Sequence, residues 1–196
     1  GLNNGLEFEH IMKKICSKRN ISNINQIKFP LIIPSVDIQT GETYIFTSKS
    51  KSRLAAYKDT IIYMNNIPIE KAVRSSCSFP GIYSPCKYNN IQFVDGGIRE
   101  NIPWRELKNL GADYTISITF EKSPKSKHEY NLFENILESI NLLSHELSIY
   151  EEYGSDYIVK IDTKNTSLLD HKQIDFLYNT GYSTMKKFIK ENAHKL

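Results

Sequence analysis

The chain has 196 residues, of which 40% are hydrophobic and 24% charged, and its formal net charge at pH 7 is +3. This composition excludes a disordered chain, and so small a charge gives no support to a nucleic-acid-binding protein, which needs a concentrated basic face. Three widely spaced cysteines without a CxxC pair favour a reducing compartment over a disulfide framework or a zinc site. Because no apolar run reaches the roughly 20 residues that span a bilayer, we expect a single cytoplasmic domain over residues 1–196, with export into a host as the alternative.

The first half of the chain alternates between helical and extended patterns. Residues 5–18 carry an apolar stripe with helical spacing. Residues 29–48, FPLIIPSVDIQTGETYIFTS, contain two β-rich runs on either side of Thr40 and Gly41, which is typical of a hairpin or of two adjacent strands. Residues 67–78 suit a short helix, with a proline in its first turn.

The second half continues this alternation. Asn89 and Asn90 stand between two strand-like runs, where asparagine tolerates the left-handed backbone of a tight turn. The pattern then predicts a helix over 103–111, a strand over 113–120, a helix over 130–150, a strand over 156–163 and a helix over 171–193. This order of elements predicts an α/β fold with a largely parallel core sheet.

The stretch IQFVDGGIREN places a carboxylate at the end of a strand. Asp95 follows an apolar run, and Gly96 and Gly97 follow at once. Ligands gather beyond the carboxyl ends of strands in open α/β sheets, where an aspartate can act as a general base. The glycines would allow a positive φ and the close approach of another segment. From spacing alone the simpler alternative, a glycine turn capped by Asp95, is favoured because Asp-Gly is a common turn dipeptide.

The segments around Asp95 also occur in a specific order. AVRSSCSFPGIYSP, FVDGG, ENIP and LGADYTISI follow one another between residues 72 and 118, FPLIIPSVDIQTGETYIFTS precedes them, and IDFLYNTGYSTMKKFI closes the chain. This ordered set resembles the patatin-like phospholipase family. In that family a helix enters a Pro-Gly segment, a hairpin leads to an Asp-Gly-Gly motif and an Asn-x-Pro turn, and a helix and a strand follow.

The resemblance implies a serine acyl hydrolase with a three-layer αβα, patatin-like fold. Such an enzyme hydrolyses carboxylic esters of phospholipids or lysophospholipids through a Ser–Asp dyad. By position the base would be Asp95, with Gly96 and Gly97 supporting the motif. The serine would stand in a GxSxG elbow and a glycine-rich loop would bind the oxyanion. The implied partner is a lipid or another ester, and peripheral contact with a membrane stays open.

The chain departs from the family at the nucleophile. Residues 1–196 contain neither a GxSxG motif nor a glycine-rich oxyanion loop. Residues 181–185, GYSTM, begin like an elbow but lack its last glycine and fall within a predicted helix. We therefore expect the C-terminal part of a longer enzyme, which holds the base without the nucleophile and is inactive alone. The alternative is a non-catalytic lipid-binding or regulatory module that retains the scaffold.

Other reactive side chains have simpler interpretations. Ser75, Ser76 and Ser78 are expected as small residues where a helix packs closely on a sheet, because an activated serine needs an adjacent base in a strained turn. Cys77 is expected as a small core residue. Asp37 precedes IQTGE, and we expect it to cap a turn.

Three further features complete the candidates. Arg99 could steer an anionic headgroup, but a solvated surface arginine is the expected case.

Residues 57–67 mix aromatic residues with isoleucines, so a lid over the acyl pocket and an ordinary core segment stay equally open. The five histidines show no metal-ligand spacing, and we expect neither a metal nor a cofactor. The last helix carries lysines that are expected to form a solvated face and not a membrane-attracting patch: Lys186, Lys187, Lys190 and Lys195.

Overall fold

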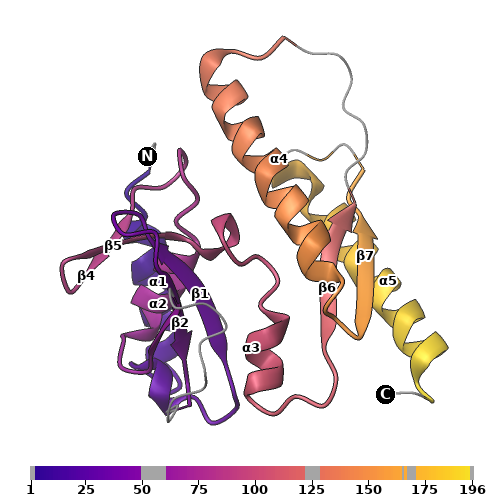
Figure 1. Cartoon of the computed structure of the whole chain (residues 1–196), viewed down its shortest axis with the longest axis horizontal. Coiled ribbons are helices and arrows are strands. Elements are labelled where there is room, and N and C mark those ends of the chain that lie inside the picture. The colour runs from indigo at the N-terminus through magenta and orange to yellow at the C-terminus, as the bar shows by residue number, and fades with distance from the viewer. Residues whose placement is uncertain (1–2, 50–60, 122–128, 165, 167–170, 195–196) are drawn as a thin grey trace.

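The computed structural model describes residues 3–49, 61–121, 129–164, 166 and 171–194, and it has the mixed helices and strands of an α/β protein (Figure 1). The α-helices of these ranges are α1 (Leu6–Ser17), α2 (Ile69–Ser76), α3 (Trp104–Asn109), α4 (Leu132–Glu152) and α5 (Ile174–Asn192). The strands are β1 (Ile32–Asp37), β2 (Thr43–Thr47), β3 (Ile61–Met64), β4 (Cys86–Tyr88), β5 (Ile91–Asp95), β6 (Ile116–Glu121) and β7 (Tyr157–Asp162). Short 3₁₀ turns are η1 (Ile24–Gln26), η2 (Gly96–Ile98) and η3 (His171–Gln173).

The predicted helices are confirmed in number and order for the described ranges. Those expected over 5–18, 67–78, 103–111, 130–150 and 171–193 correspond to α1 through α5. No helix within these ranges combines the length and the hydropathy that crossing a bilayer requires.

The larger sheet has the strand order β3-β2-β1-β5-β4, and the prediction of a largely parallel sheet is wrong for it. Only β2 and β3 pair in parallel, whereas β1 pairs antiparallel with both β2 and β5, and β4 pairs antiparallel with β5. For the β1–β2 and β4–β5 pairs the cause is the length of the connection. Residues 38–42 join β1 to β2 and residues 89–90 join β4 to β5, and turns this short can only reverse the chain. Of the two arrangements left open for residues 29–48 the structure has the hairpin, and the turn predicted at Asn89 and Asn90 is confirmed. Both hairpins contradict a largely parallel sheet.

The smaller sheet consists of β6 and β7, which pair in parallel and are connected through α4. The two helices of this part lie against opposite faces (Figure 1). Tyr157 contacts Phe188 of α5 with ring centroids 5.8 Å apart. On the other face Lys160 forms an ion pair with Glu152 of α4 at 2.9 Å. Side chains alternate along β6, so that Thr119 is buried whereas its apolar neighbours are exposed.

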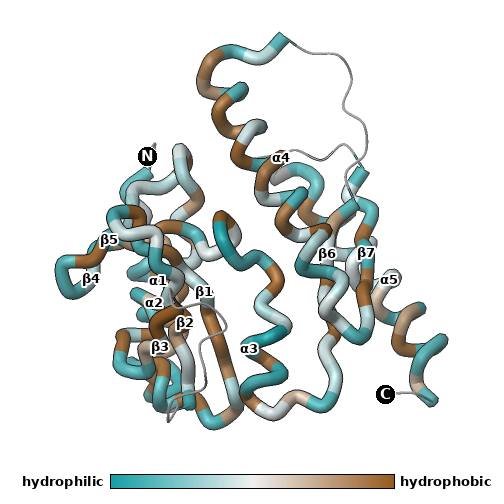
Figure 2. Tube along the Cα trace, in the orientation of Figure 1, coloured by the Kyte–Doolittle hydropathy of each residue, from teal (hydrophilic) through white to brown (hydrophobic). Residues whose placement is uncertain are grey.

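The main core lies between the larger sheet and α2, with α1 packed on the outside of α2 (Figures 1 and 2). Phe93 of β5 is its centre, because it is fully buried and meets Tyr44 and Phe46 edge-to-face at centroid distances of 5.0 and 5.2 Å. The segment left open between lid and core contributes here. Ile67 is fully buried in this core and residues 61–64 form β3, whereas residues 57–60 lie outside the described residues.

Replacing Phe93 with alanine should lower the free energy of unfolding by about 3–5 kcal/mol, because the substitution leaves a cavity beside two aromatic rings. Phe29, which is 62% exposed, supplies the matched control, and Phe29→Ala should change stability by less than about 0.5 kcal/mol. Urea unfolding of both variants measures the difference. Equal losses for the two variants would contradict the position of the core.

Candidate active site

Asp95 lies at the junction of three segments of the larger sheet's core. Its backbone pairs with Ser35 of β1, and its N–H donates to the Ser78 carbonyl at 3.1 Å. Its side chain caps η2, since Oδ1 accepts the Gly97 N–H at 2.8 Å. The turn-capping interpretation is therefore confirmed, and it uses one of the two carboxylate oxygens.

The other oxygen, Oδ2, accepts no hydrogen bond from the residues that the structure describes, and Asp95 forms no ion pair with them. The residue is half-buried. Burial raises the pKa of the Asp95 carboxyl above its ordinary value, and the Gly97 N–H opposes this effect. A carboxylate with a free oxygen and a raised pKa has the properties of a general base.

Close approach to backbone, and not a positive φ, requires glycine at position 96, whereas the atom nearest to a Cβ on Gly97 belongs to a side chain. Neither is among the positive-φ glycines, because both belong to a 3₁₀ turn with helical backbone. A Cβ on Gly96 would lie 2.5 Å from the Pro34 carbonyl oxygen, and one on Gly97 would lie 2.8 Å from Asn101 Oδ1. The expected positive φ is therefore wrong, whereas the expected close contact of another segment is confirmed.

The loop that follows Asp95 is held by α4. Glu151 Oε2 accepts the backbone N–H groups of Asn101 and Ile102 at 3.0 and 2.7 Å. The Asn101 side chain donates to Ser148 Oγ at 2.6 Å and lies beside Gly97. Because Gly97 also donates to the Asp95 carboxylate, α4 holds the segment that carries Gly97 and borders Asp95. No motif in the sequence indicates this role of Glu151.

Arg99 and Asp37 hold the opposite side of this loop. Arg99 is half-buried and donates to the Gly41 carbonyl, so the expectation of a solvated arginine is wrong. Gly41 belongs to the β1–β2 turn, and Asp37 organises that turn by accepting the Gln39 N–H and the Thr40 hydroxyl. The predicted capping role of Asp37 is thus confirmed.

The segment from α2 to Ser78 has structural serines. Ser75 and Ser78 are fully buried, as expected for small residues under a helix. Ser78 Oγ accepts from the Arg74 guanidinium and donates to the Arg74 carbonyl. Arg74 is itself buried and bonds the carbonyls of Asn4 and Ser84, so it ties the start of the chain to this segment.

Cys77 is exposed, and its predicted position in the core is wrong. The reason is that α2 ends at Ser76, so that Cys77 lies at the C-cap and leaves the packed face of the helix. Partial burial of the sulfur and the nearby Asp95 carboxylate raise the pKa of the Cys77 thiol, and Arg74 opposes them. A thiol of raised pKa is a poor nucleophile. Cys77 therefore lies near the Asp95 carboxylate as a neutral thiol.

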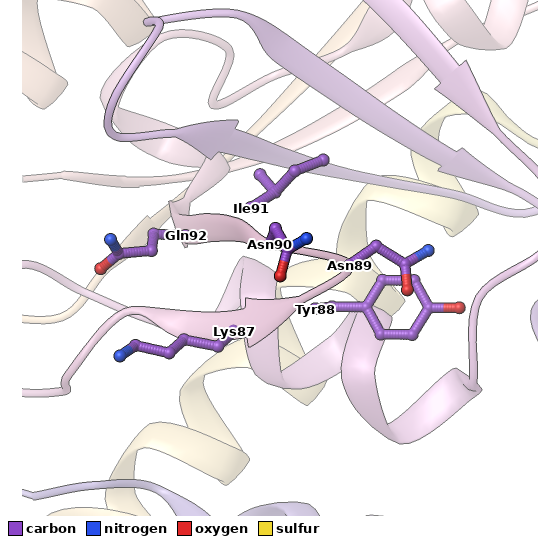
Figure 3. Close-up of a pocket in the computed structure, with 6 residues that line it drawn as sticks. All are labelled: Lys87, Tyr88, Asn89, Asn90, Ile91 and Gln92. Atoms are coloured by element: carbon purple, nitrogen blue, oxygen red, sulfur yellow. The ribbon is translucent and has the colours of Figure 1, made fainter.

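The surface hollow shown in Figure 3 is separate from this site. It has a volume of about 360 Å³ and is formed by the β4–β5 hairpin. It lies at the start of β5, whereas Asp95 ends that strand. In the described ranges no group of three or more histidine, cysteine or acidic side chains could hold a metal ion.

Comparison with known protein families matches residues 3–108 to the patatin-like phospholipases, and this range includes Asp95 and both glycines. Since the match covers more than half of the chain, the chain belongs to the patatin-like phospholipase family. Members of this family are lipid acyl hydrolases.

The chain is also similar to individual proteins. An uncharacterized protein of Acanthamoeba polyphaga mimivirus is 27% identical over 207 residues, which cover 96% of this chain and 65% of that protein. Lysophospholipase NTE1 of Meyerozyma guilliermondii is 39% identical over 46 residues, 24% of this chain and 3% of that protein. An uncharacterized NTE family protein of Mycobacterium tuberculosis is 27% identical over 62 residues, 32% of this chain and 17% of that protein. The chain thus spans less than two thirds of the length of each.

Gly96→Ala should lower the free energy of unfolding by about 1–3 kcal/mol or more, because the new methyl group collides with backbone that cannot rotate away. Gly181→Ala is the matched control, since a Cβ there meets only Ile161 Cδ1 at an ordinary 3.8 Å. That change removes a glycine from inside α5 and should raise stability by about 0.5–1 kcal/mol. Thermal or urea unfolding distinguishes the two signs, and a neutral Gly96→Ala would refute the close contact.

Glu151→Ala should lower the free energy of unfolding by about 1.5–3 kcal/mol, because two backbone donors lose a charged acceptor. Glu151→Gln keeps one carbonyl oxygen and should lose about half as much or less. Glu191, which is 60% exposed and 4.0 Å from Lys187, provides a control whose alanine variant should stay within about 0.5 kcal/mol. Equal effects of Glu151→Ala and Glu191→Ala would show that the α4 link is weak.

Proposed function

We propose that this chain forms part of a serine acyl hydrolase that cleaves carboxylic esters of phospholipids or lysophospholipids through a Ser–Asp dyad. Asp95 is the base of the proposed dyad, and the serine lies on polypeptide outside residues 1–196. The observation that carries the proposal is the Asp95 carboxylate, which is half-buried, has a raised pKa and keeps Oδ2 unbonded among the described residues. Its position within the family match supports the same role.

In the proposed reaction the serine Oγ attacks the acyl carbonyl carbon while Asp95 takes its proton. Collapse of the tetrahedral intermediate breaks the ester bond, and Asp95 returns the proton to the departing alcohol. Water then attacks the acyl-enzyme, Asp95 accepts its proton, and the fatty acid leaves as the serine is reprotonated. The Gly97 N–H fixes one carboxylate oxygen throughout, which leaves the second oxygen to exchange protons.

The open edge of β6 supports a position for the missing polypeptide. Within the described residues β6 pairs only with β7, and Ile118 and Phe120 are 52% and 64% exposed. A strand with an open edge and exposed apolar side chains favours pairing with a further strand. In the proposed complete fold the further strand that pairs with β6 comes from the polypeptide that carries the serine. The extended sheet then has helices on both faces. About a third of the mimivirus relative has no counterpart in this chain, which leaves sufficient length for such a segment.

A non-catalytic lipid-binding or regulatory module is the second candidate. The absence of GxSxG from residues 1–196 is the observation that favours it. The two candidates differ in one respect that can be measured, since only the enzyme needs the ionised form of Asp95.

Asp95→Asn in the complete polypeptide, meaning residues 1–196 with the upstream residues of the same gene, should reduce kcat for a phospholipid ester by about 10²–10⁴-fold, because an amide cannot accept the serine proton. Asp113→Asn is the matched control, since Asp113 is exposed and precedes β6, and its variant should keep kcat. Near-normal turnover by Asp95→Asn would refute the assignment of the base.

The pH dependence of kcat/KM gives a second measurement. Catalysis requires the carboxylate, and burial raises the pKa of Asp95. On acidification, kcat/KM should therefore begin to fall at a higher pH than it would with an aspartate of ordinary pKa as the base.

A fluorophosphonate probe should label one serine of the complete polypeptide and leave residues 1–196 unlabelled. Labelling of the shorter chain would mean that the nucleophile lies within it.

A further inference from the structure

The surface at the end of α1 combines a hollow with positive charge. The hollow has a volume of about 430 Å³. Its apolar walls include Ile21 and Ile27, which pack against the main core from outside, and Phe29, which is 62% exposed. Its remaining lining residues are polar or basic: Arg19, Asn20, Gln26 and Lys28.

One face of α1 extends this surface. Ile11, Lys14, Ile15 and Lys18 follow the spacing i, i+3, i+4, i+7, which places them on one stripe of the helix. Ile11 and Ile15 are 51% and 53% exposed. The other side of α1 packs on α2, and α1 has no fully buried residue. The two isoleucines of the stripe therefore have no packing partner among the described residues.

The charge of the surface is of one sign. Residues 10–36 contain no aspartate or glutamate and carry five cationic side chains, namely Lys13, Lys14, Lys18, Arg19 and Lys28. The Lys49 ammonium adds another positive charge, because it donates to the Lys28 carbonyl at 3.0 Å. Glu7 and Glu9 belong to the first turn of α1, and Glu9 pairs with Lys71 of α2. A basic cluster of this size attracts an anionic partner.

We propose that this surface, the α1 stripe with the adjoining hollow, docks on an anionic phospholipid bilayer. Cations draw the protein to acidic headgroups, and exposed apolar side chains between them enter the interface, which is how amphipathic surface helices bind membranes. A nucleic acid would use the charges and could stack on Phe29, but it would not use the aliphatic Ile11 and Ile15. The preference for a phospholipid surface over other anionic surfaces rests on the proposed function. The positive charge and the exposed apolar side chains are observed independently of that function.

Sedimentation of the complete polypeptide with vesicles of phosphatidylcholine, with and without phosphatidylserine, tests this proposal. The protein should sediment with the acidic vesicles, and added salt should weaken this binding. The Arg19→Glu/Lys28→Glu variant should bind roughly 30-fold or more weakly, since each cation near an acidic membrane contributes about a fivefold factor. The Ile15→Ser/Phe29→Ser variant should also lose binding, although its charge is unchanged.

The matched control reverses two charges elsewhere. Lys186→Glu/Lys190→Glu lies on α5, beside the exposed Ile189, and should leave vesicle binding unchanged. Loss of binding in this control with retention in the Arg19→Glu/Lys28→Glu variant would overturn the proposal. Equal binding to neutral vesicles, or no binding to either kind, would also overturn it. An oligonucleotide that competes with vesicles for the parent, together with full binding by Ile15→Ser/Phe29→Ser, would identify a general polyanion site instead.

Failure of this proposal can be distinguished from failure of the proposed function. Asp95→Asn should bind acidic vesicles like the parent protein, because the base is not part of the surface. The Arg19→Glu/Lys28→Glu variant should hydrolyse a water-soluble short-chain ester at the parental rate, which also verifies its fold. If no variant hydrolyses any ester, the enzyme assignment fails while the vesicle measurement still decides the docking surface.

Discussion

The contact between Gly96 and the Pro34 carbonyl is the constraint on which the arrangement of the candidate site depends. It brings the chain after β5 against β1 with no room for a side chain. At the same point the Asp95 N–H reaches the Ser78 carbonyl, which ties both strands to the segment after α2. A carboxylate at such a junction can be half-buried without an ion pair, because its orientation is fixed by backbone groups instead of by an opposite charge. Its pKa is therefore free to rise with burial.

The difference between the predicted and the observed sheet has a definite physical origin. Alternation of strands and helices indicates crossovers and thus parallel pairing, and it applies to β6, α4 and β7. It fails for the first half, where the turn signals at Thr40-Gly41 and Asn89-Asn90 already require antiparallel pairs. Local turn chemistry is therefore the stronger signal when it conflicts with the overall order of elements.

The sequence was sufficient to predict that Asp95 ends a strand, that it caps a turn and that another segment lies close to the glycines, because these signals coincide in adjacent residues. Glu151 could not be found in this way. Glu151 accepts hydrogen bonds from Asn101 and Ile102, which lie 50 and 49 residues earlier in the sequence. A glutamate within a helix has no local sequence pattern that indicates such distant partners. Cys77 was misplaced for a related reason, since one residue at a helix end decides between the buried and the exposed side.

Two exposed apolar surfaces of this chain call for different partners, and backbone hydrogen bonding distinguishes them. Among the described residues no strand pairs with the second edge of β6, and lipid tails cannot satisfy backbone N–H and C=O groups, so the exposed Ile118 and Phe120 suit another strand. In α1 the helix satisfies its own backbone, and the apolar stripe lies among cations. Such a surface can face a bilayer at no cost in backbone hydrogen bonds. Exposure alone would treat the two surfaces as equivalent, whereas secondary structure and charge support the two proposals, namely another strand beside β6 and a lipid surface beside α1.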